Sequence, residues 1–547
     1  MKLLLLAGLA AATAASATVP AGDADELSTY VTARAADALG DPARAAQLFA
    51  NLSVERPEDM SLRRRAIAGA IAAGDVKLAI QLGRGMPVAQ TPLDFRLLLV
   101  ADELRSGSDR KALEILRTRQ GIIDSSFLAP FVEAWTLAER RNARALDVLA
   151  QVTPGSALAG QLNEQRALIH LKLKRPKEAA PFAKAALESA GGRADRLRLA
   201  LADGFLEAGD RAQALAMLEG PGAALAEGRA RIAAGKRTGQ GIDTSQKAFS
   251  ELMVGLSLAL SRLQDKSLPL AFAQVARYAD PSNSAGAILL ALLLEDDDRP
   301  TDALDTLRAI DPSDPFAGEA EDAEIRILID SNRHPEALRR AQEIIAMRPG
   351  PDSFSRLGVV HLEMKNYAAA ADAYARAIQL SATAASSDET WTLRLYRASA
   401  LEESGKWEEA KAELALALQA RPDNPLLLNF LGYGKLERGE DLDSAEAMVR
   451  KASALRPEDA SITDSLGWAE FKRGRLPQAI ATLQRAAAAD PSQAEIQEHL
   501  GDALYSAGRR YEARFAWRAA LVNADGEDRK RIESKIEIGL NAATAAP

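Results

Sequence analysis

The chain has 547 residues, of which 47% are hydrophobic and 26% charged, so it holds enough apolar material for a sizeable core. Its formal net charge of -8 argues against a nucleic-acid partner, because proteins that bind phosphate backbones carry a basic stripe. Cysteine is absent, which excludes disulfides, thiolate metal sites and cysteine nucleophiles.

The first residues have the pattern of an export signal. Lys2 supplies positive charge, Leu3 to Leu6 begin an apolar stretch, and Ala15-Ser16-Ala17 is a small-x-small cleavage site. We therefore predict a signal peptide over 1–17, cleaved after Ala17, and a periplasmic or secreted protein. The alternative is a retained membrane anchor, since no charge occurs between Lys2 and Asp23. No other uncharged run is long enough to cross a bilayer, so we expect no stable membrane insertion after cleavage.

From there on the chain repeats a spacing in which Gly is followed five residues later by Ala. Neighbouring glycines lie 33 to 35 residues apart over most of the chain, as in a helix-turn-helix repeat. The Gly is expected to end the first helix in a left-handed conformation, and the Ala to lie where the second helix crosses the first. The pairs are Gly40/Ala45, Gly74/Ala79, Gly107/Ala112, Gly209/Ala214, Gly405/Ala410, Gly474/Ala479 and Gly508/Ala513, with Gly439/Ala445 one residue longer.

Weaker copies keep only the alanine, at Ala145, Ala179, Ala303, Ala337 and Ala370, with a doubtful one at Ala271. The predicted organisation is an N-terminal array over 18–219, a Gly-rich hinge or insertion over 220–247, degenerate repeats over 248–349, a C-terminal array over 350–524, and a capping helix with a tail over 525–547. The hinge is expected to be a flexible loop; the alternative is a mobile segment that gates or contacts a partner.

The clearest repeats carry Leu431-Gly432-Tyr433, Leu466-Gly467-Trp468 and Leu500-Gly501-Asp502, each opening a tight helix contact. With the alanines and prolines that follow, they resemble the tetratricopeptide repeats of secreted proteobacterial proteins. The resemblance covers most of 24–524 and implies an all-α, right-handed superhelical solenoid of about 13–14 repeats. The last blocks are also similar to adaptors that tether a carboxyl-terminal processing protease to the outer membrane, but this chain lacks their lipobox cysteine.

No motif for catalysis, cofactor binding or metal binding emerges. The histidines are scattered and none belongs to an HExxH arrangement, while GxSxG and GxGxxG are missing. The hinge is too short to bury a core of its own, so the repeats leave no room for a catalytic domain. We expect a non-enzyme without cofactor or metal; a glycan-processing enzyme is the remote alternative. The histidines are His170, His334, His361 and His499.

In the resembling family, positions 2, 5, 9, 12 and 13 of the first helix face a concave groove. In the last three repeats they select aromatic and carboxylate side chains, which suit a bound peptide segment. Retained folding with lost binding in Trp468→Ala would favour this groove, whereas unfolding would indicate that the aromatic residues only pack against the next helix. The predicted groove residues are Asn429, Tyr433, Leu436, Glu437, Asp464, Trp468, Phe471, Lys472, Glu498, Asp502, Tyr505 and Ser506.

Two functions from different classes follow. The first is a scaffold or adaptor in the bacterial cell envelope that binds a protein or peptide partner, such as an envelope protease or an assembly factor. The second is a structural array that associates end to end during envelope assembly or secretion. A recruiter should expose apolar surface on its groove and a self-assembler at its ends, and sedimentation of the purified protein distinguishes them.

Overall fold

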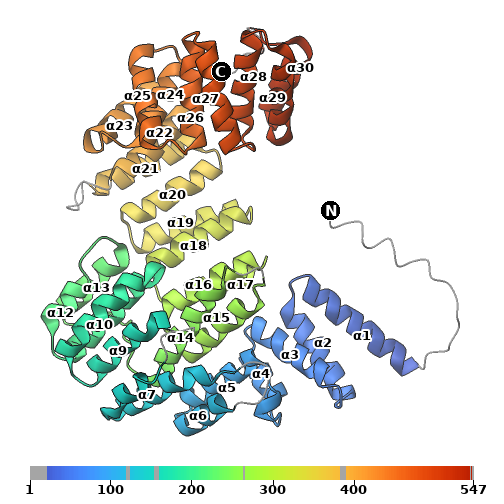
Figure 1. Cartoon of the computed structure of the whole chain (residues 1–547), viewed down its shortest axis with the longest axis vertical. Coiled ribbons are helices and arrows are strands. Elements are labelled where there is room, and N and C mark those ends of the chain that lie inside the picture. The colour runs from blue at the N-terminus through green and yellow to red at the C-terminus, as the bar shows by residue number, and fades with distance from the viewer. Residues whose placement is uncertain are drawn as a thin grey trace. The chain divides into compact units, whose positions relative to one another are not determined.

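The computed structural model describes residues 21–118, 124–152, 159–262, 265–381, 390–541 and 544. The predicted signal peptide, 1–17, lies outside these residues. Within them the chain is helical with no strand, which confirms the predicted all-α repeat fold. Two compact units divide the chain, residues 1–331 and 332–547, and each is described by itself (Figure 1).

The first unit contains α1 (Ala21–Ala38), α2 (Pro42–Glu55), α3 (Met60–Ala72), α4 (Val76–Gly83), α5 (Leu93–Arg105), α6 (Asp109–Arg117), α7 (Ala129–Glu139), α8 (Arg144–Leu149), α9 (Leu162–Lys172), α10 (Pro176–Ser189), α11 (Ala194–Glu207), α12 (Arg211–Met217), α13 (Ala223–Ala233), α14 (Ser245–Leu260), α15 (Ser267–Ala279), α16 (Ser284–Asp296), α17 (Pro300–Arg308) and α18 (Ala317–Asp330). Its short 3-10 helices are η1 (Val88–Gln90), η2 (Ser126–Leu128), η3 (Ala159–Gln161) and η4 (Gly191–Arg193).

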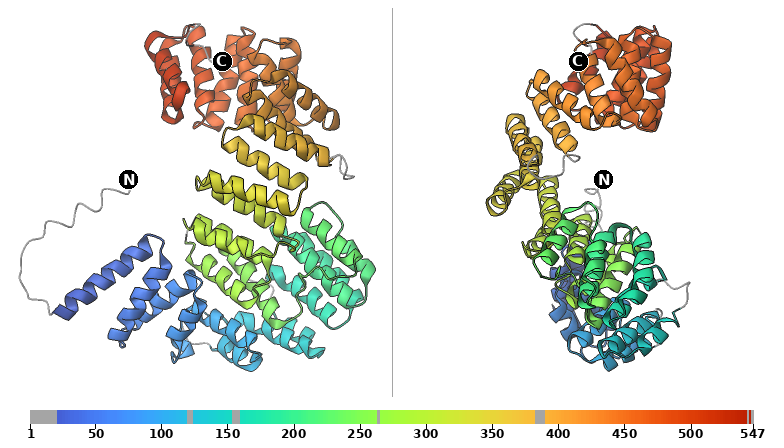
Figure 2. Two further views of the ribbon diagram at one scale, coloured as in Figure 1. Left: turned by 180° about the vertical axis from the view of Figure 1, so that it is seen from behind. Right: turned by 90° about the vertical axis from the view of Figure 1, so that its left-hand side faces the viewer.

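The second unit contains α19 (His334–Met347), α20 (Pro351–Glu363), α21 (Tyr367–Ser381), α22 (Thr390–Glu403), α23 (Trp407–Ala420), α24 (Pro425–Glu437), α25 (Leu442–Leu455), α26 (Ala460–Lys472), α27 (Leu476–Ala489), α28 (Ala494–Ser506), α29 (Arg510–Asn523) and α30 (Gly526–Ile538). Figure 2 shows their succession from two further sides. No helix of the described residues is both long and apolar enough to cross a membrane.

Consecutive helices pack as pairs: α1/α2 to α11/α12, α14/α15 and α16/α17 in the first unit, and α20/α21 to α28/α29 in the second. The alanine of each repeat is in the second helix, where a larger side chain would overpack the contact at a cost of about 1–3 kcal/mol. These alanines are at most 1% exposed: Ala45, Ala79, Ala112, Ala145, Ala179, Ala214, Ala303, Ala337, Ala370, Ala410, Ala445, Ala479 and Ala513.

The turn after the first helix of a repeat has a left-handed residue in strong and weak copies alike. The glycines singled out from the sequence have φ between +65° and +90°. In the weak copies other residues adopt the same conformation, at a cost of about 1–2 kcal/mol. The period therefore continues where Gly is missing. The replacing residues, with φ between +56° and +62°, are Arg141, Lys174, Asp298, Asn332 and Lys365.

The three glycines predicted to open a tight helix contact do so, and a Cβ atom on Gly432 would lie 2.8 Å from Cγ1 of Val449. A Cβ atom on Gly467 would lie 2.6 Å from Cγ of Leu483, and one on Gly501 would lie 2.3 Å from Trp517. Since real Cβ contacts do not come this close, only Gly allows the first and second helices of these repeats to approach as they do.

The segment expected to be a flexible Gly-rich loop, 220–247, is ordered. It contains α13, and the chain after this helix is buried at Thr238 and Gln240. The fully buried Asp203 carboxylate of α11 accepts hydrogen bonds from the backbone N–H groups of Thr238 at 2.7 Å and Gly239 at 3.1 Å. A sequence rich in Gly therefore forms a tightly anchored connection, because the glycines let the backbone come close to a buried carboxylate. The predicted domain boundaries stay predictions.

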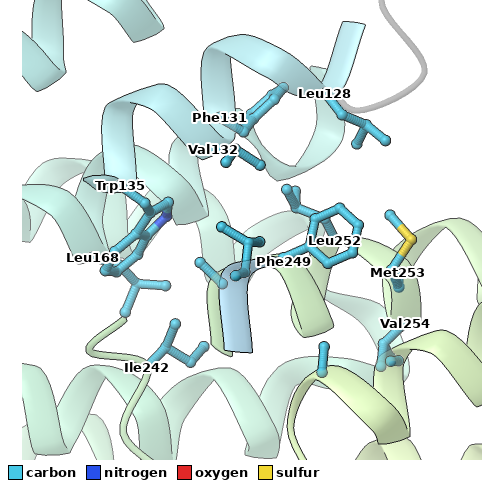
Figure 3. Packing of buried hydrophobic residues seen from close by; sticks show 14 of the residues in the cluster. Leu128, Phe131, Val132, Trp135, Leu168, Ile242, Phe249, Leu252, Met253 and Val254 are labelled. Carbon is cyan, nitrogen blue, oxygen red and sulfur yellow. The ribbon is translucent and has the colours of Figure 1, made fainter. Parts of the chain in front are cut away.

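In the first unit, α14 and α15 pack against α3, α5 and α7, which precede them by many residues (Figure 1). Figure 3 shows Phe249 and Leu252 of α14 facing Phe131 and Trp135 of α7 in one apolar cluster. The Tyr278 hydroxyl of α15 donates to the Asp102 carboxylate of α5 at 2.6 Å. The first helices of these early repeats are thus covered by the chain's own later helices.

Candidate functional site

The second unit contains a pocket of about 690 Å³. It is formed by the last residues of α22 and α24, the first turns of α28 and α30, and the connection between α29 and α30. This volume suits one or a few side chains of a bound segment. The lining residues are Glu402, Glu403, Tyr433, Glu437, Arg438, Ala494, Glu495, Glu498, His499, Asn523, Ala524, Asp525, Asp528, Arg531 and Ile532.

The lining of this pocket is strongly acidic, with seven carboxylates against two arginines and His499. Both arginines are already paired. Arg438 contacts the Glu402 carboxylate at 3.0 Å, and Arg531 contacts Glu498 at 2.8 Å and Asp528 at 2.6 Å. The pocket therefore has an excess of negative charge that its own cations do not neutralise.

Three of the lining carboxylates have no cationic partner among the described residues: Glu403, Glu495 and Asp525. Glu403 and Glu495 are exposed side chains at the end of α22 and in the first turn of α28. Glu495 accepts a hydrogen bond from the Tyr433 hydroxyl at 2.7 Å. These carboxylates are open to a cation that comes from outside the chain.

Burial and the neighbouring carboxylates raise the pKa of two groups that line the pocket. Burial raises the pKa of Glu402, with Glu403 and Glu437 adding to the shift and Arg438 opposing it. Burial also raises the pKa of Tyr433, and the charges of Glu495 and Glu437 raise it further. Both shifts favour the less negative form of the group, as expected where carboxylates repel added negative charge.

The predicted groove residues differ in burial. Asp464, Trp468, Glu498 and Asp502 are buried residues, each at most 4% exposed. Lys472 and Ser506 are exposed, Leu436 is buried, and Asn429, Tyr433, Glu437, Phe471 and Tyr505 are half-buried. Only Tyr433, Glu437 and Glu498 line the pocket. Whether any of the predicted residues binds a partner stays a prediction.

Trp468 lies between the first helices of two repeats. Its ring stacks on His499 of α28 with centroids 3.9 Å apart, and on Phe471 with centroids 4.7 Å apart. Its indole N–H donates to the Glu437 carboxylate at 2.5 Å. Since removal of Trp468 would disturb this stack, Trp468→Ala is a poor probe of binding alone.

Glu498 and Asp502 contact the terminal helix α30. The fully buried Lys535 ammonium lies 2.6 Å from the Glu498 carboxylate and 2.7 Å from that of Asp502. Asp502 also accepts a hydrogen bond from the Trp517 indole at 2.9 Å. In this chain the two carboxylates hold the end of the solenoid together.

His499 is buried and its Nδ1 atom lies 2.8 Å from the Asp464 carboxylate. Burial opposes the charged ring, but Asp464, with Glu495 and Asp502 beyond it, raises the pKa of His499 to about 9 from its ordinary 6.5. The ring is therefore an imidazolium at neutral pH, and its proton is held more tightly in the folded chain than in the unfolded chain.

We expect the second unit to lose stability at alkaline pH through this pair. Because the pKa of His499 is higher in the folded state, its stabilisation is complete below about pH 6.5 and is lost as the pH rises through about 9. The loss is up to about 3 kcal/mol by linkage. Thermal unfolding at pH 6 and pH 9.5 measures it, and His499→Gln should flatten the difference. An equal alkaline loss in His499→Gln would contradict this assignment.

Sequence reasoning missed Glu402 and Glu403, because the groove assignment was carried over only the last three repeats. Glu403 stands one period of 34 residues before Glu437, so the same register, extended one repeat earlier, would have found it. Asp525 and Asp528 line the pocket because α30 turns back after α29. No repeat spacing in the sequence predicts this turn.

The described residues contain no group of three or more His, Asp or Glu side chains placed to hold a metal ion. The buried carboxylates near the pocket are occupied by Lys535, Arg531 and His499. The carboxylates that have no cationic partner among the described residues leave negative charge in the pocket.

Two segments match family models. Residues 323–385 match a model described as a tetratricopeptide repeat, and residues 467–508 match one described as a TPR repeat. These matches support the resemblance to the tetratricopeptide-repeat family, whose repeats generally mediate protein–protein interaction. No curated protein matches the sequence.

Among solved structures, the chain is similar to the APC/C hetero-tetramer Cut9-Hcn1, with 14% identity, 93% of this chain and 89% of that chain covered, and a TM-score of 0.36. It is similar to yeast Tom70, with 12% identity, 94% and 96% covered, and a TM-score of 0.31. Pseudomonas aeruginosa pilF is 19% identical, with 33% and 79% covered and a TM-score of 0.29.

Proposed function

We propose that this protein is a non-catalytic scaffold whose acidic pocket in the second unit binds a lysine- or arginine-bearing segment of a partner protein. The observation that carries the proposal is the set of three lining carboxylates, Glu403, Glu495 and Asp525, that have no cationic partner in the described chain. A cationic side chain in the pocket would pair with them and lower their mutual repulsion.

The half-buried Tyr433 ring supplies apolar surface beside the carboxylates. An alkyl stem of Lys or Arg can lie along such surface while its charged end reaches the carboxylates. This combination favours a peptide side chain over a free inorganic cation, for which no cluster of ligands is present in the described residues.

The test is the affinity of the full chain for fluorescent peptides. A peptide with spaced lysines and arginines should bind, and its acidic analogue should not. The double variant Glu403→Gln/Glu495→Gln should bind about tenfold more weakly, since two charge pairs are lost. Binding should also weaken as salt rises.

A matched control is Glu458→Gln/Glu512→Gln, which removes two exposed carboxylates outside the pocket and should bind like the unaltered chain. The proposal would be contradicted if the pocket variant and the control variant bound the basic peptide with equal affinity. It would also be contradicted if the acidic peptide bound as tightly as the basic peptide.

Export to the periplasm belongs to the same proposal. It is supported by the pattern of Lys2, Leu3 to Leu6 and Ala15-Ser16-Ala17. The mass of the mature N-terminus tests it: a chain that keeps residues 1–17 would contradict cleavage.

An adaptor role for an envelope protease is the narrowest form of the proposal and rests on the repeat resemblance.

A second candidate is end-to-end association. Large apolar side chains are exposed on α29 and α30 near the C-terminus, where Tyr511 is 75% exposed, Val522 78% and Ile538 67%. On α1, Leu27 is 63% exposed and Leu39, just beyond it, 85%. Exposed apolar residues at chain ends favour contacts between copies. Sedimentation that is independent of concentration would exclude this candidate.

A further inference from the structure

A second pocket, of about 450 Å³, lies inside the first unit. It is formed where α15 packs back on α3 and α5, and residues of α16 and α17 complete its lining. Three arginines line it, Arg105, Arg277 and Arg299, together with Asp302 and Asp305. This concentration of arginine is unlike the acidic pocket of the second unit.

Two of the arginines are satisfied within the chain. Arg299 binds the Asp302 carboxylate at 2.6 and 2.8 Å and donates to the backbone carbonyl of Ala72 at 2.9 Å. Arg105 donates to the backbone carbonyl of Tyr278, and its guanidinium lies 4.5 Å from the centre of the Tyr278 ring. These contacts fix one wall of the pocket and leave Arg277 to be accounted for.

Arg277 is half-buried, and no hydrogen bond or ion pair in the described chain includes its guanidinium. Burial lowers the pKa of Arg277, and no nearby carboxylate offsets the shift. Partial burial removes some of the water around a charge, and an opposite charge offsets that loss. The unpaired, half-buried guanidinium at the wall of the pocket is therefore able to pair with an anion from outside the chain.

The charge of the lining indicates the kind of anion. Asp302 neutralises Arg299. The charges of Arg105, Arg277 and Asp305 then leave about one positive charge in the lining, which one negative charge would balance. A carboxylate meets this balance and matches the planar fork of a guanidinium with two parallel hydrogen bonds. A phosphate dianion would meet repulsion from Asp302 and Asp305.

We propose that this pocket binds a carboxylate of a partner protein, held bidentately by Arg277. The carboxylate comes either from an Asp or Glu side chain or from a C-terminus, since both present the same group. This contact is independent of the acidic pocket in the second unit and is opposite to it in charge.

Calorimetric titration of the full chain tests it with three probes. The first is a glutamate-containing peptide with an amidated C-terminus, the second a neutral peptide with a free C-terminal carboxylate, and the third inorganic phosphate. At least one peptide should bind, and the tighter one identifies the source of the carboxylate. Arg277→Gln should weaken that binding tenfold or more, and Arg277→Lys should restore it only in part, because the fork is lost.

Arg110→Gln is the matched control, since its side chain is 90% exposed and lies outside the pocket. It should leave peptide binding unchanged, and circular dichroism should show that all variants keep their helix content. Binding of phosphate alone, no binding of either peptide, or equal peptide binding by Arg277→Gln would overturn the proposal. The lysine-containing peptide of the second unit should bind Arg277→Gln as before, so failure of one site is distinguishable from failure of the other.

Discussion

Replacement of Lys535 by Met should free the terminal helix α30 from the rest of the second unit. The Lys535 ammonium is fully buried between the Glu498 and Asp502 carboxylates, so its removal leaves buried negative charge uncompensated. Loss of one partner from a buried ion pair costs about 3–5 kcal/mol. Amide hydrogen exchange in α28 to α30 of the full chain should therefore speed up by a factor of roughly 10² or more.

The control is Lys530→Met on the same helix, whose ion pair with Glu527 is 70% and 85% exposed. An exposed pair contributes about 0–1 kcal/mol, so exchange should change little. If Lys535→Met exchanged at the same rate as Lys530→Met, the Lys535 site would be open to water and α30 would not be held by it.

Replacement of Glu251 by Ala should unfold or loosen the interior of the first unit. The Glu251 carboxylate of α14 is 1% exposed and binds Arg196 at 2.7 Å, Arg193 at 3.0 Å and the Asn283 amide at 2.9 Å. Without it, the buried Arg196 keeps only the backbone carbonyl of Gln240 as a hydrogen-bond acceptor among the described residues. We expect a loss of about 3–5 kcal/mol in the free energy of unfolding, measured by urea titration.

Glu227→Ala serves as the control, because its pair with Arg231 spans one helical turn and the Glu227 side chain is 49% exposed. Its effect should stay below about 1 kcal/mol. Glu251→Gln should fall between the two, since an amide keeps the shape and part of the hydrogen bonding. Similar losses in Glu251→Ala and Glu227→Ala would show that the buried charges do not anchor α14.

Much of the fold follows from the sequence because the repeat is a local device. The Gly that ends a helix and the Ala at a helix crossing each act within one helix pair, so a period of about 34 residues exposes them. The weak copies of the repeat are harder to recognise in the sequence, since Arg141, Lys174 and Lys365 adopt the left-handed turn without the Gly that marks it. There only the alanines showed the register.

The site was harder to predict from the sequence. The repeat register shows which residues share one face of a helix, but it does not show which other residues cover that face. Trp468 occupies a groove position, yet the next repeat places His499 on its ring. Glu498 and Asp502 occupy groove positions too, yet Lys535 arrives from α30. Helix α30 follows the last repeat, so the repeat spacing in the sequence does not predict its contacts.

The interior of the first unit could not be foreseen at all. The contact of Tyr278 with Asp102 joins residues 176 apart, and that of Arg299 with Ala72 joins residues 227 apart. A repeat whose units touch only their neighbours does not predict such contacts. The arginine pocket depends on them, which is why composition and periodicity gave no sign of it.

The most direct test of the scaffold is site-specific photo-crosslinking of the full chain in its own cells. A photoreactive residue replaces the exposed Asn523, which lines the acidic pocket without contributing a carboxylate, and in a second variant it replaces Tyr511, which is 75% exposed on α29. We predict that the Asn523 position captures a different protein through a segment rich in lysine or arginine, which peptide mass spectrometry identifies. Capture of only a second copy of this chain, from either position, would contradict the account and favour an end-to-end array.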